Sequence, residues 1–284
     1  MKKFIIAITA LGLLGGAVAH AKTDPAKDLK EIQKYFTTKF PGVPMQEYAN
    51  GIYGINAGRR VEWESTMEFP PFEPGVDAGE ALYNKYKGAF AKCFGKSAGK
   101  GIRQNYPMFD AKSGDIVTFE GAINSCLKKN GQKPLGWKKG KLAALSAYMA
   151  STSNGKAISI KVPNNKKALA WYQRGKDHFY AKRGQLNLSC ANCHIYSAGG
   201  QIRGNILSPA LGHVSHFPVY RKKWEAGGKG VTGGFGTLHR RYGGCNKQVR
   251  AKPFKAQSDE YKALEYFHTY MSNGINVNAP GVRQ

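Results

Sequence analysis

The chain has 284 residues, and its 43 Lys and Arg side chains against 18 Asp and Glu give a formal net charge of +25 at pH 7. Charged residues make up 21% and hydrophobic residues 42%, a composition that excludes an intrinsically disordered chain. The length is sufficient for two domains, each with its own hydrophobic core. Five cysteines are too few for a disulfide scaffold, and their odd number leaves at least one for another role.

The first 21 residues have the pattern of a secretory signal: Lys2 and Lys3, an apolar run over residues 4–18, and a small-x-small site that ends at Ala21. The apolar run is shorter than the roughly 20 residues that span a bilayer, which argues against a retained membrane anchor. We therefore expect cleavage after Ala21, a periplasmic protein and no membrane span. In an exported protein without nucleic-acid-binding motifs, the basic balance favours acidic protein partners or small anions over nucleic acid.

Residues 22–75 form an N-terminal extension that carries little information. Residues 28–36 have an amphipathic helical pattern, and residues 61–72 are expected to be extended, with Pro70 and Pro71 near their end. The sequence leaves open whether the extension packs on the domain that follows or covers a partner interface.

An internal repeat follows the extension. Residues 144–155 align without gaps with residues 263–274, and both have the pattern of a helix that ends at Asn-Gly. Cys126 and Cys245 each lie 29 residues before the Gly of their own copy. Further upstream, residues 90–94 align with residues 190–194, and Gly79 with Gly175 on a preceding helix.

The second copy contains a C-x-x-C-H box, the attachment signature of c-type haem, at Cys190, Cys193 and His194. Two thiols at this spacing can form thioethers with the two vinyl groups of one porphyrin, and the adjacent His then lies under the iron. The alternatives are a redox C-x-x-C pair or half of a zinc site, and the sequence has no second Cys/His pair at zinc spacing. We therefore expect one covalently bound haem c, with His194 as the proximal iron ligand.

A loop rich in Gly and Pro follows the box, over residues 199–212. Class I cytochromes c have a similar loop, in which a proline carbonyl accepts a hydrogen bond from the proximal His. This resemblance implies that Pro209 orients His194, and a plain turn is the alternative.

The first copy has lost the box, because Phe90 and Phe94 stand where the second copy has Cys190 and His194. Without the proximal ligand, the first copy cannot hold iron in the usual way. We therefore expect a mainly α fold with two class I cytochrome c-like domains in tandem, of which only the second binds haem. The expected boundaries are 76–157 for the haemless domain, 158–165 for a linker and 166–284 for the haem domain.

Cys93 and Cys126 belong to the haemless domain. If Cys245 faces the haem in the second copy, its counterpart Cys126 should face the lost haem site, which Cys93 also lines. We expect a Cys93–Cys126 disulfide at this place, and two buried free thiols are the alternative.

Cys245 is the cysteine left over. Residues 240–255 contain six Lys and Arg side chains and no Asp or Glu, and nearby cations lower the pKa of a thiol. We expect Cys245 to be the distal ligand of the haem iron and the reactive sulfur, on a basic loop; a spare surface thiol is the alternative. Met271 is expected to pack in the core. Three histidines remain as other candidates for the distal position: His213, His216 and His239.

Several segments of the chain resemble the SoxA family, a subunit of the SoxAX cytochrome of bacterial sulfur oxidation. They are residues 183–186 (RGQL), 189–194 (SCANCH), 217–221 (FPVYR), 240–245 (RRYGGC) and 256–261 (AQSDEY). Family members carry two haems or one, and Phe90 and Phe94 make this chain similar to the single-haem form.

The resemblance implies a function and a set of partners. SoxA pairs with a small cytochrome c, SoxX, and couples thiosulfate oxidatively to a cysteine of the SoxYZ carrier, which gives an S-thiosulfonate. The activity is that of an L-cysteine S-thiosulfotransferase. The resemblance also implies that a persulfide on Cys245 ligates the iron opposite His194, and that Arg241 belongs to the catalytic site. The alternative is a plain periplasmic electron-transfer cytochrome c without bond-making chemistry.

Overall fold

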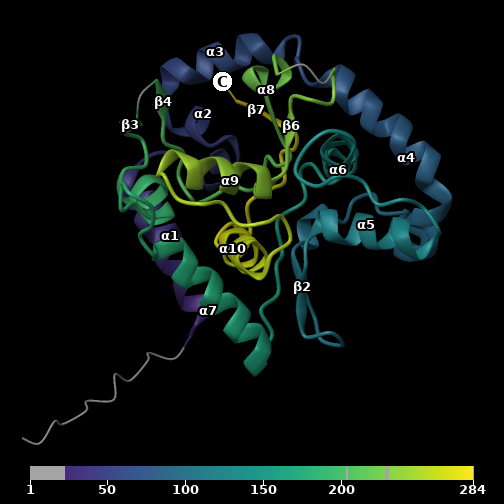
Figure 1. Cartoon of the computed structure of the whole chain (residues 1–284). Helices are drawn as coiled ribbons and strands as arrows, with labels where there is room; N and C mark the ends of the chain where they lie inside the picture. Colours follow the sequence, from purple (N-terminus) through teal and green to yellow (C-terminus); the bar gives the residue numbers. More distant parts are fainter. Residues whose placement is uncertain (1–22, 203, 228–229, 284) are drawn as a thin grey trace, which may run out of the picture.

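The computed structural model of the chain describes residues 23–202, 204–227 and 230–283. The expected signal segment and its cleavage site after Ala21 lie outside the described residues. The fold is mainly helical, as expected (Figure 1). Within the described ranges, no helix combines the length and the hydropathy of a bilayer-crossing segment.

Among the described residues, eight helices of more than two turns form most of the fold. They are α1 (Pro25–Lys39), α3 (Ala57–Met67), α4 (Glu73–Phe94), α5 (Phe119–Lys129), α6 (Lys141–Ser151), α7 (Lys166–Tyr180), α9 (Leu238–Gln248) and α10 (Asp259–Tyr270). The shorter helical segments are α2 (Ile52–Ile55), α8 (Lys222–Glu225), three 3₁₀ turns (Met45–Asn50, Gly95–Ser97, Arg103–Asn105) and a π-helical turn (Asn192–Tyr196). Figure 1 shows α4, α5 and α6 on one side of the molecule and α1, α7 and α10 on the other.

In the part of the chain that the structure describes, the strands are short and form three small sheets. β1 (Met108–Asp110) pairs with β2 (Asp115–Val117), and β3 (Gln201–Ile202) pairs with β4 (Asn205–Ile206), both antiparallel. The third sheet has the order β6-β5-β7, from Phe235–Gly236, Val219–Arg221 and Gly281–Arg283. In it, β5 is antiparallel to β6 and parallel to β7, so that Arg221 lies opposite Arg283.

The extension is more helical than its sequence suggests. The helix expected at residues 28–36 lies within α1, where the Asp24 side chain accepts a hydrogen bond from the amide of Lys27. The expectation of an extended segment over residues 61–72 was wrong for its first half, which belongs to α3. The side chain of Asn56 caps α3, and Arg60 forms an ion pair with Glu64 one turn away; such contacts stabilise a helix whose apolar pattern is weak.

The two copies of the repeat contain equivalent helix pairs. Helix α4 packs against α6, and α7 packs against α10. A Cβ atom on Gly79 of α4 would lie 2.2 Å from the carbonyl oxygen of Ala144, and one on Gly175 of α7 would lie 2.0 Å from that of Ala263. Because the two glycines align in the sequence repeat, as do the two alanines, both copies use the same close helix crossing. Helix α4 begins at Glu73, ahead of the expected domain boundary at residue 76.

Aromatic side chains fill the first copy where the second has its cysteine box. Phe90 is fully buried, with its ring centroid 5.8 Å from that of Tyr83 and 6.0 Å from that of Phe94. A disulfide joins Cys93 of α4 to Cys126 of α5, so the alternative of two free thiols was wrong. This bond ties the C-terminal end of α4 to the neighbouring helix.

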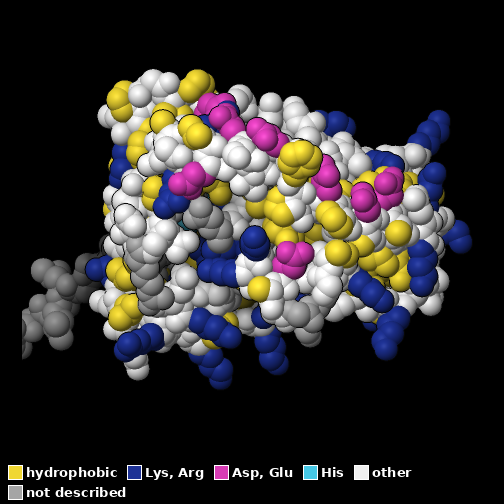
Figure 2. Space-filling view, turned by 90° about the horizontal axis from the view of Figure 1, so that it is seen from above, with side chains coloured by type: hydrophobic (Ala, Val, Ile, Leu, Met, Phe, Trp, Pro, Cys, Tyr) yellow, Lys and Arg dark blue, Asp and Glu magenta, His cyan; other side chains and the backbone are white. Residues whose placement is uncertain are grey.

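Acidic side chains are concentrated in one segment of this basic protein. Residues 61–84 contain six Asp and Glu and no Lys or Arg, and they form most of α3 and the first half of α4. Helix α3 lies at the top of Figure 1, and Figure 2, which views the molecule from above, shows a row of acidic side chains. The charge is therefore unevenly distributed, which can orient charged partners during their approach.

The close helix crossing predicts the effect of a small substitution. Gly175→Ala should lower the free energy of unfolding by about 1–3 kcal/mol, because the new methyl group overlaps the Ala263 carbonyl. Gly88→Ala, in the exposed middle of α4 with nothing within 4 Å of the new Cβ, should instead raise it by about 0.5–1 kcal/mol. Urea denaturation of both variants measures this difference, and equal effects of the two substitutions would contradict the packing described.

The disulfide predicts a second effect on stability. Replacing both Cys93 and Cys126 by Ser should lower the free energy of unfolding by about 3–4 kcal/mol. The disulfide closes a loop of 33 residues, and without it the unfolded chain gains conformational entropy. Denaturation of the wild type with and without reductant is the control: the reduced wild type should unfold like the double variant. A double variant as stable as the oxidised wild type would contradict the prediction.

Candidate functional site

The second copy contains a cavity of about 410 Å³ between the C-x-x-C-H box and helix α9. Cys190, Cys193 and His194 of the box line it, and so do Cys245 and Arg241 of α9. The structure thus brings together all five residues that the sequence analysis assigned to a haem and sulfur site, although the two segments lie about fifty positions apart in the chain.

Local hydrogen bonds set the shape of the cysteine box. The Asn192 side-chain oxygen accepts from both the amide and the hydroxyl of Ser189, at 2.9 Å each, and the Ser189 hydroxyl accepts from the amide of Asn192 at 3.1 Å. This reciprocal cap begins the turn before Cys190, and the π-helical turn Asn192–Tyr196 continues it. The two variable positions of the box therefore lie within a defined turn, which fixes the separation of the two thiols.

His194 is held by a backbone carbonyl, but not by the one expected. Its Nδ1 lies 2.8 Å from the carbonyl oxygen of Ser208, so the expectation that Pro209 provides this acceptor was wrong. The amide of Ala210 donates to the carbonyl of His194 at 2.7 Å, and this contact places the carbonyl before Pro209 under the ring. Because Nδ1 donates to Ser208, Nε2 is the ring nitrogen that could bind a metal ion.

Cys245 lies on a helix, and the expectation of a basic loop was wrong. Helix α9 continues through Gly243 and Gly244 because it packs against α10, where Asn246 donates a hydrogen bond to the hydroxyl of Tyr261 at 2.8 Å. The helical geometry places Arg241 and Cys245 one turn apart on the same face. Both side chains therefore line the cavity.

The surroundings of Cys245 lower its pKa to about 7. Burial by itself raises the pKa of the thiol, but the charge of Arg241, a hydrogen bond with His194 and the charges of His194 and Arg221 together outweigh it. The cavity thus favours the thiolate, which is the form that binds metals and attacks sulfur.

Five further cations line the cavity: Arg59, Arg183, Arg221, Lys223 and Arg283. Burial and then the charge of Arg241 lower the pKa of Arg221 to about 10, which leaves it protonated at neutral pH. Burial, together with Arg221 and Arg241, also lowers the pKa of Lys223. No Asp or Glu is among the described residues that line the cavity. The cavity is therefore suited to a small anion.

Sequence reasoning missed Arg221 and Arg283 as cavity residues, because no motif joins them. Arg221 lies at the end of β5 and Arg283 at the end of β7, and only the parallel pairing of the two strands puts them opposite each other. In the sequence, residues 217–221 stand out only because they resemble the SoxA family. Its cationic end was the one signal that could have pointed to Arg221.

The neighbouring Arg240 has a different role from Arg241. Its guanidinium lies 3.9 Å from the ring centroid of Trp224, and that of Arg221 lies 5.4 Å from it. Arg240 also donates to the carbonyl of Gly233 at 3.1 Å. Among the described residues that line the cavity, Arg241 is present and Arg240 is not. Arg240 therefore stacks on Trp224 outside the described lining, whereas Arg241 lines the cavity.

The other distal candidates occupy different places. His239 is not among the described lining residues; its Nε2 lies 3.1 Å from a Glu265 oxygen and its Nδ1 accepts from the amide of Gln257. His213 and His216 do line the cavity, and the ring centroid of His213 lies 4.6 Å from that of His194. Met271 is buried in the core, as expected.

The residues present fit a c-type haem. The cavity offers two thiols at the attachment spacing, one imidazole with its second nitrogen fixed by a carbonyl, and a cysteine favoured as thiolate. Its apolar lining includes Phe179, Phe217 and Leu264. The buried Nδ1 of His213 has no hydrogen-bond partner within the described part of the chain, so a polar group of a bound ligand would complete its bonding.

Comparisons with known proteins find relatives over most of the chain. Residues 78–158 match the family described as SoxA/TsdA, cytochrome c domain; this stretch is the first copy of the repeat. The L-cysteine S-thiosulfotransferase subunit SoxA of Chlorobaculum thiosulfatiphilum is 48% identical over 260 residues, 90% of this chain and 87% of that protein. The SoxA subunit of Allochromatium vinosum is 43% identical, over 92% of this chain and 90% of that protein.

A solved structure is similar as well. The crystal structure of SoxXA from P. pantotrophus matches with a TM-score of 0.66 and 29% identity, over 78% of this chain and 84% of that chain. The SoxA subunit of Paracoccus pantotrophus is 30% identical over 99% of this chain and 97% of that protein. The chain therefore belongs to the SoxA family of L-cysteine S-thiosulfotransferase subunits.

Proposed function

We propose that the chain is a c-type cytochrome subunit that couples thiosulfate oxidatively to a cysteine of a SoxYZ-like carrier protein and produces an S-thiosulfonate. One observation carries this proposal: Cys245, Arg241 and the C-x-x-C-H box line the same cation-rich cavity. A cavity that served electron transfer alone would not need a thiol among several cations.

The haem site forms the first part of the proposal. Cys190 and Cys193 would hold one haem c through thioethers, and His194 and the sulfur of Cys245, as thiolate or persulfide, would bind its iron. When bound, the haem supplies a one-electron redox centre beside Cys245, so the removal of two electrons calls for a second redox centre on a partner protein.

A tandem arrangement accounts for the single haem. The first cytochrome c-like unit would span residues 76–157 and the second residues 166–284, joined by a linker at 158–165. The equivalent crossings of α4 with α6 and of α7 with α10 support two related units. The buried ring of Phe90 and the Cys93–Cys126 disulfide support the assignment of the haem to the second unit.

The cations of the cavity would bind the substrate. Thiosulfate is a dianion, and a guanidinium group can bind two of its oxygens at once. Arg241 and Arg221 approach Cys245 closely enough to lower its pKa, so an anion bound between them would lie near the sulfur. Arg241 would thus hold substrate and thiolate together.

The sulfur chemistry balances in two steps. In the first, the Cys245 thiolate and the sulfane sulfur of thiosulfate form an S–S bond, and two electrons leave the pair. In the second, a cysteine thiolate of the carrier attacks the sulfane sulfur and displaces Cys245 as thiolate. The carrier keeps the S-thiosulfonate, and the proton of its thiol passes to solvent.

The partners follow from this chemistry. A SoxX-like small cytochrome c would accept electrons, and the SoxXA title of the structural neighbour supports such a pair. A SoxYZ-like carrier would deliver the cysteine. The signal-like first 21 residues, with cleavage after Ala21, support a periplasmic location.

Substitution of Cys245 tests the proposed reaction. In the complex with its small cytochrome, Cys245→Ala should no longer add thiosulfate to the carrier, because the reacting sulfur is gone, while intact mass still shows one haem on the chain. Mass spectrometry of the carrier after incubation with thiosulfate and an electron acceptor measures the product. If the Cys245→Ala complex modifies the carrier at the wild-type rate, the chain is an electron-transfer cytochrome and the proposal fails.

A pair of adjacent arginines tests the binding site. Arg241→Met should raise the KM for thiosulfate by about 10- to 100-fold, since it removes a charge-assisted contact worth about 1.5–3 kcal/mol. Arg240→Met is the matched control, because this side chain stacks on Trp224 and is absent from the described cavity lining; its KM should stay within about twofold of wild type. Equal effects of the two variants would contradict the role of Arg241.

A further inference from the structure

We propose that Lys39, assisted by Tyr35, positions the proximal ligand His194 by holding the carbonyl end of the turn that carries it. The N-terminal extension would therefore be part of the haem site. This inference rests on the haem site proposed above, and it gives a role to a segment that the repeat and the cysteine motif do not explain.

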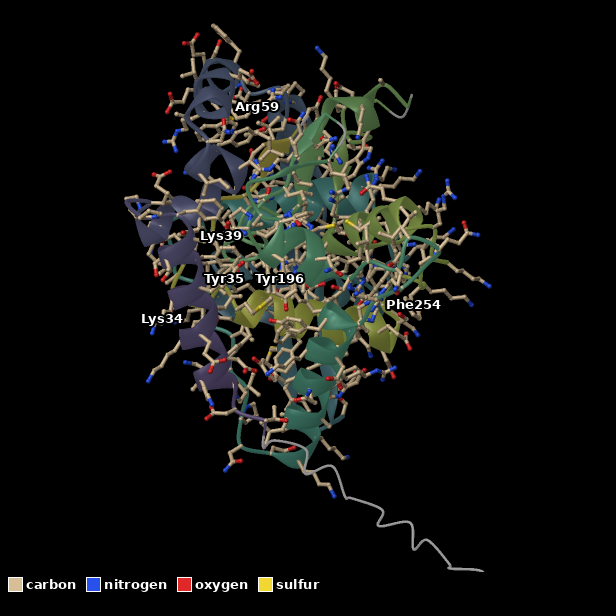
Figure 3. The ribbon with its side chains drawn as sticks, turned by 90° about the vertical axis from the view of Figure 1, so that its left-hand side faces the viewer. Lys34, Tyr35, Lys39, Arg59, Tyr196 and Phe254 are labelled. Atoms are coloured by element: carbon tan, nitrogen blue, oxygen red, sulfur yellow. A yellow bond between two sulfur atoms is a disulfide. The ribbon has the colours of Figure 1, made fainter. Side chains whose placement is uncertain are left out.

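The contacts reach the chain directly after the ligand. The ammonium of Lys39 donates to the carbonyl oxygen of Tyr196 at 2.6 Å and to that of Ile195 at 3.1 Å. The hydroxyl of Tyr35 donates to the same Ile195 oxygen at 3.2 Å. Figure 3 shows Tyr35 and Lys39 on α1 beside Tyr196. Residues 35 and 39 are one turn apart, so both face the turn from the same side of α1.

The position of these donors matches the needs of the turn. A helical segment leaves its last carbonyl groups without internal partners and carries a partial negative charge at that end. The π-helical turn Asn192–Tyr196 is only five residues long, so its remaining hydrogen bonds provide little rigidity. A cation that binds two of its final carbonyls both satisfies the acceptors and fixes the direction of the turn.

The extension also supports the loop that orients the His194 ring. The ring of Phe40 lies 3.0 Å from the place of a Cβ on Gly199, and the carbonyl oxygen of Tyr48 lies 2.2 Å from that on Gly212. These glycines flank Ser208, whose carbonyl accepts from His194. The extension thus contacts the chain both before and after Ser208, whose carbonyl accepts the hydrogen bond from His194.

The charge of Lys39 adds an electrostatic effect. The side chain is half-buried, so solvent screens it less than an exposed lysine. A positive charge beside the proximal ligand favours the reduced state of the redox centre. Loss of Lys39 should therefore lower the midpoint potential and loosen the turn at the same time.

A pair of charge-matched variants tests the inference on the haem-loaded protein. Lys39→Met should lower the midpoint potential and speed hydrogen exchange at the amides of Ser197 and Ala198 by about tenfold. This factor corresponds to the loss of one charge-assisted hydrogen bond. Lys34→Met makes the same charge change at an exposed position of α1, apart from Tyr196 in Figure 3, and should change neither. Lys39→Arg should restore both values, and Tyr35→Phe should speed the same amides by a smaller factor.

The readouts separate positioning from general stability. A purely structural role would lower the melting temperature of Lys39→Met and leave the potential and the ferric electron paramagnetic resonance spectrum, which reports the orientation of the ligand ring, unchanged. That result, or a Lys39→Met protein identical to Lys34→Met, would overturn the inference. A wild-type chain that carries no haem would instead overturn the proposed function, so the two failures are distinguishable.

Discussion

The site depends on the electrostatic attraction between one half-buried thiol, that of Cys245, and the arginines around it. Burial alone would raise the pKa of Cys245, yet the charges of Arg241 and Arg221 and the hydrogen bond with His194 lower it to about 7. The same cations that favour the thiolate would attract a sulfur oxyanion, because the cavity offers no described acidic side chain to neutralise them. In the proposed function, nucleophile activation and substrate binding would thus have one physical cause, and a change that weakens either should weaken both.

The fold brings these groups together from distant parts of the chain. Helix α9 places Arg241 one turn before Cys245, and the parallel pairing of β5 with β7 adds Arg221 and Arg283. The C-x-x-C-H turn forms another part of the cavity lining. The loop that follows it supports this turn, because the carbonyl of Ser208 accepts a hydrogen bond from His194. Burial and, after it, the charge of Arg241 lower the pKa of Arg221, so mutual repulsion is part of the cost of keeping several cations close together. Such a cavity is more stable with an anion bound than without one.

Much of the site could be predicted from the sequence, because its chemistry lies in short motifs. The cysteine box and the repeat together predicted Cys245 and His194 at one site, and both line the same cavity; the repeat also predicted the Cys93–Cys126 pair. The predictions that were wrong or missing concern features that depend on tertiary contacts. Gly243 and Gly244 favoured a loop, but packing of α9 against α10 keeps them helical. Arg221 and Arg283 carry no local signal, since only strand pairing brings them to the cavity.

Iron K-edge X-ray absorption of the ferric protein tests the central claim most directly, because it identifies the atoms bound to the iron. We predict one sulfur and five nitrogens around the iron of the wild type, and loss of the sulfur when residue 245 is replaced by Ala. A first shell of six nitrogens in the wild type, or a sulfur that persists in that variant, would show that another side chain occupies the sixth position and would contradict the account.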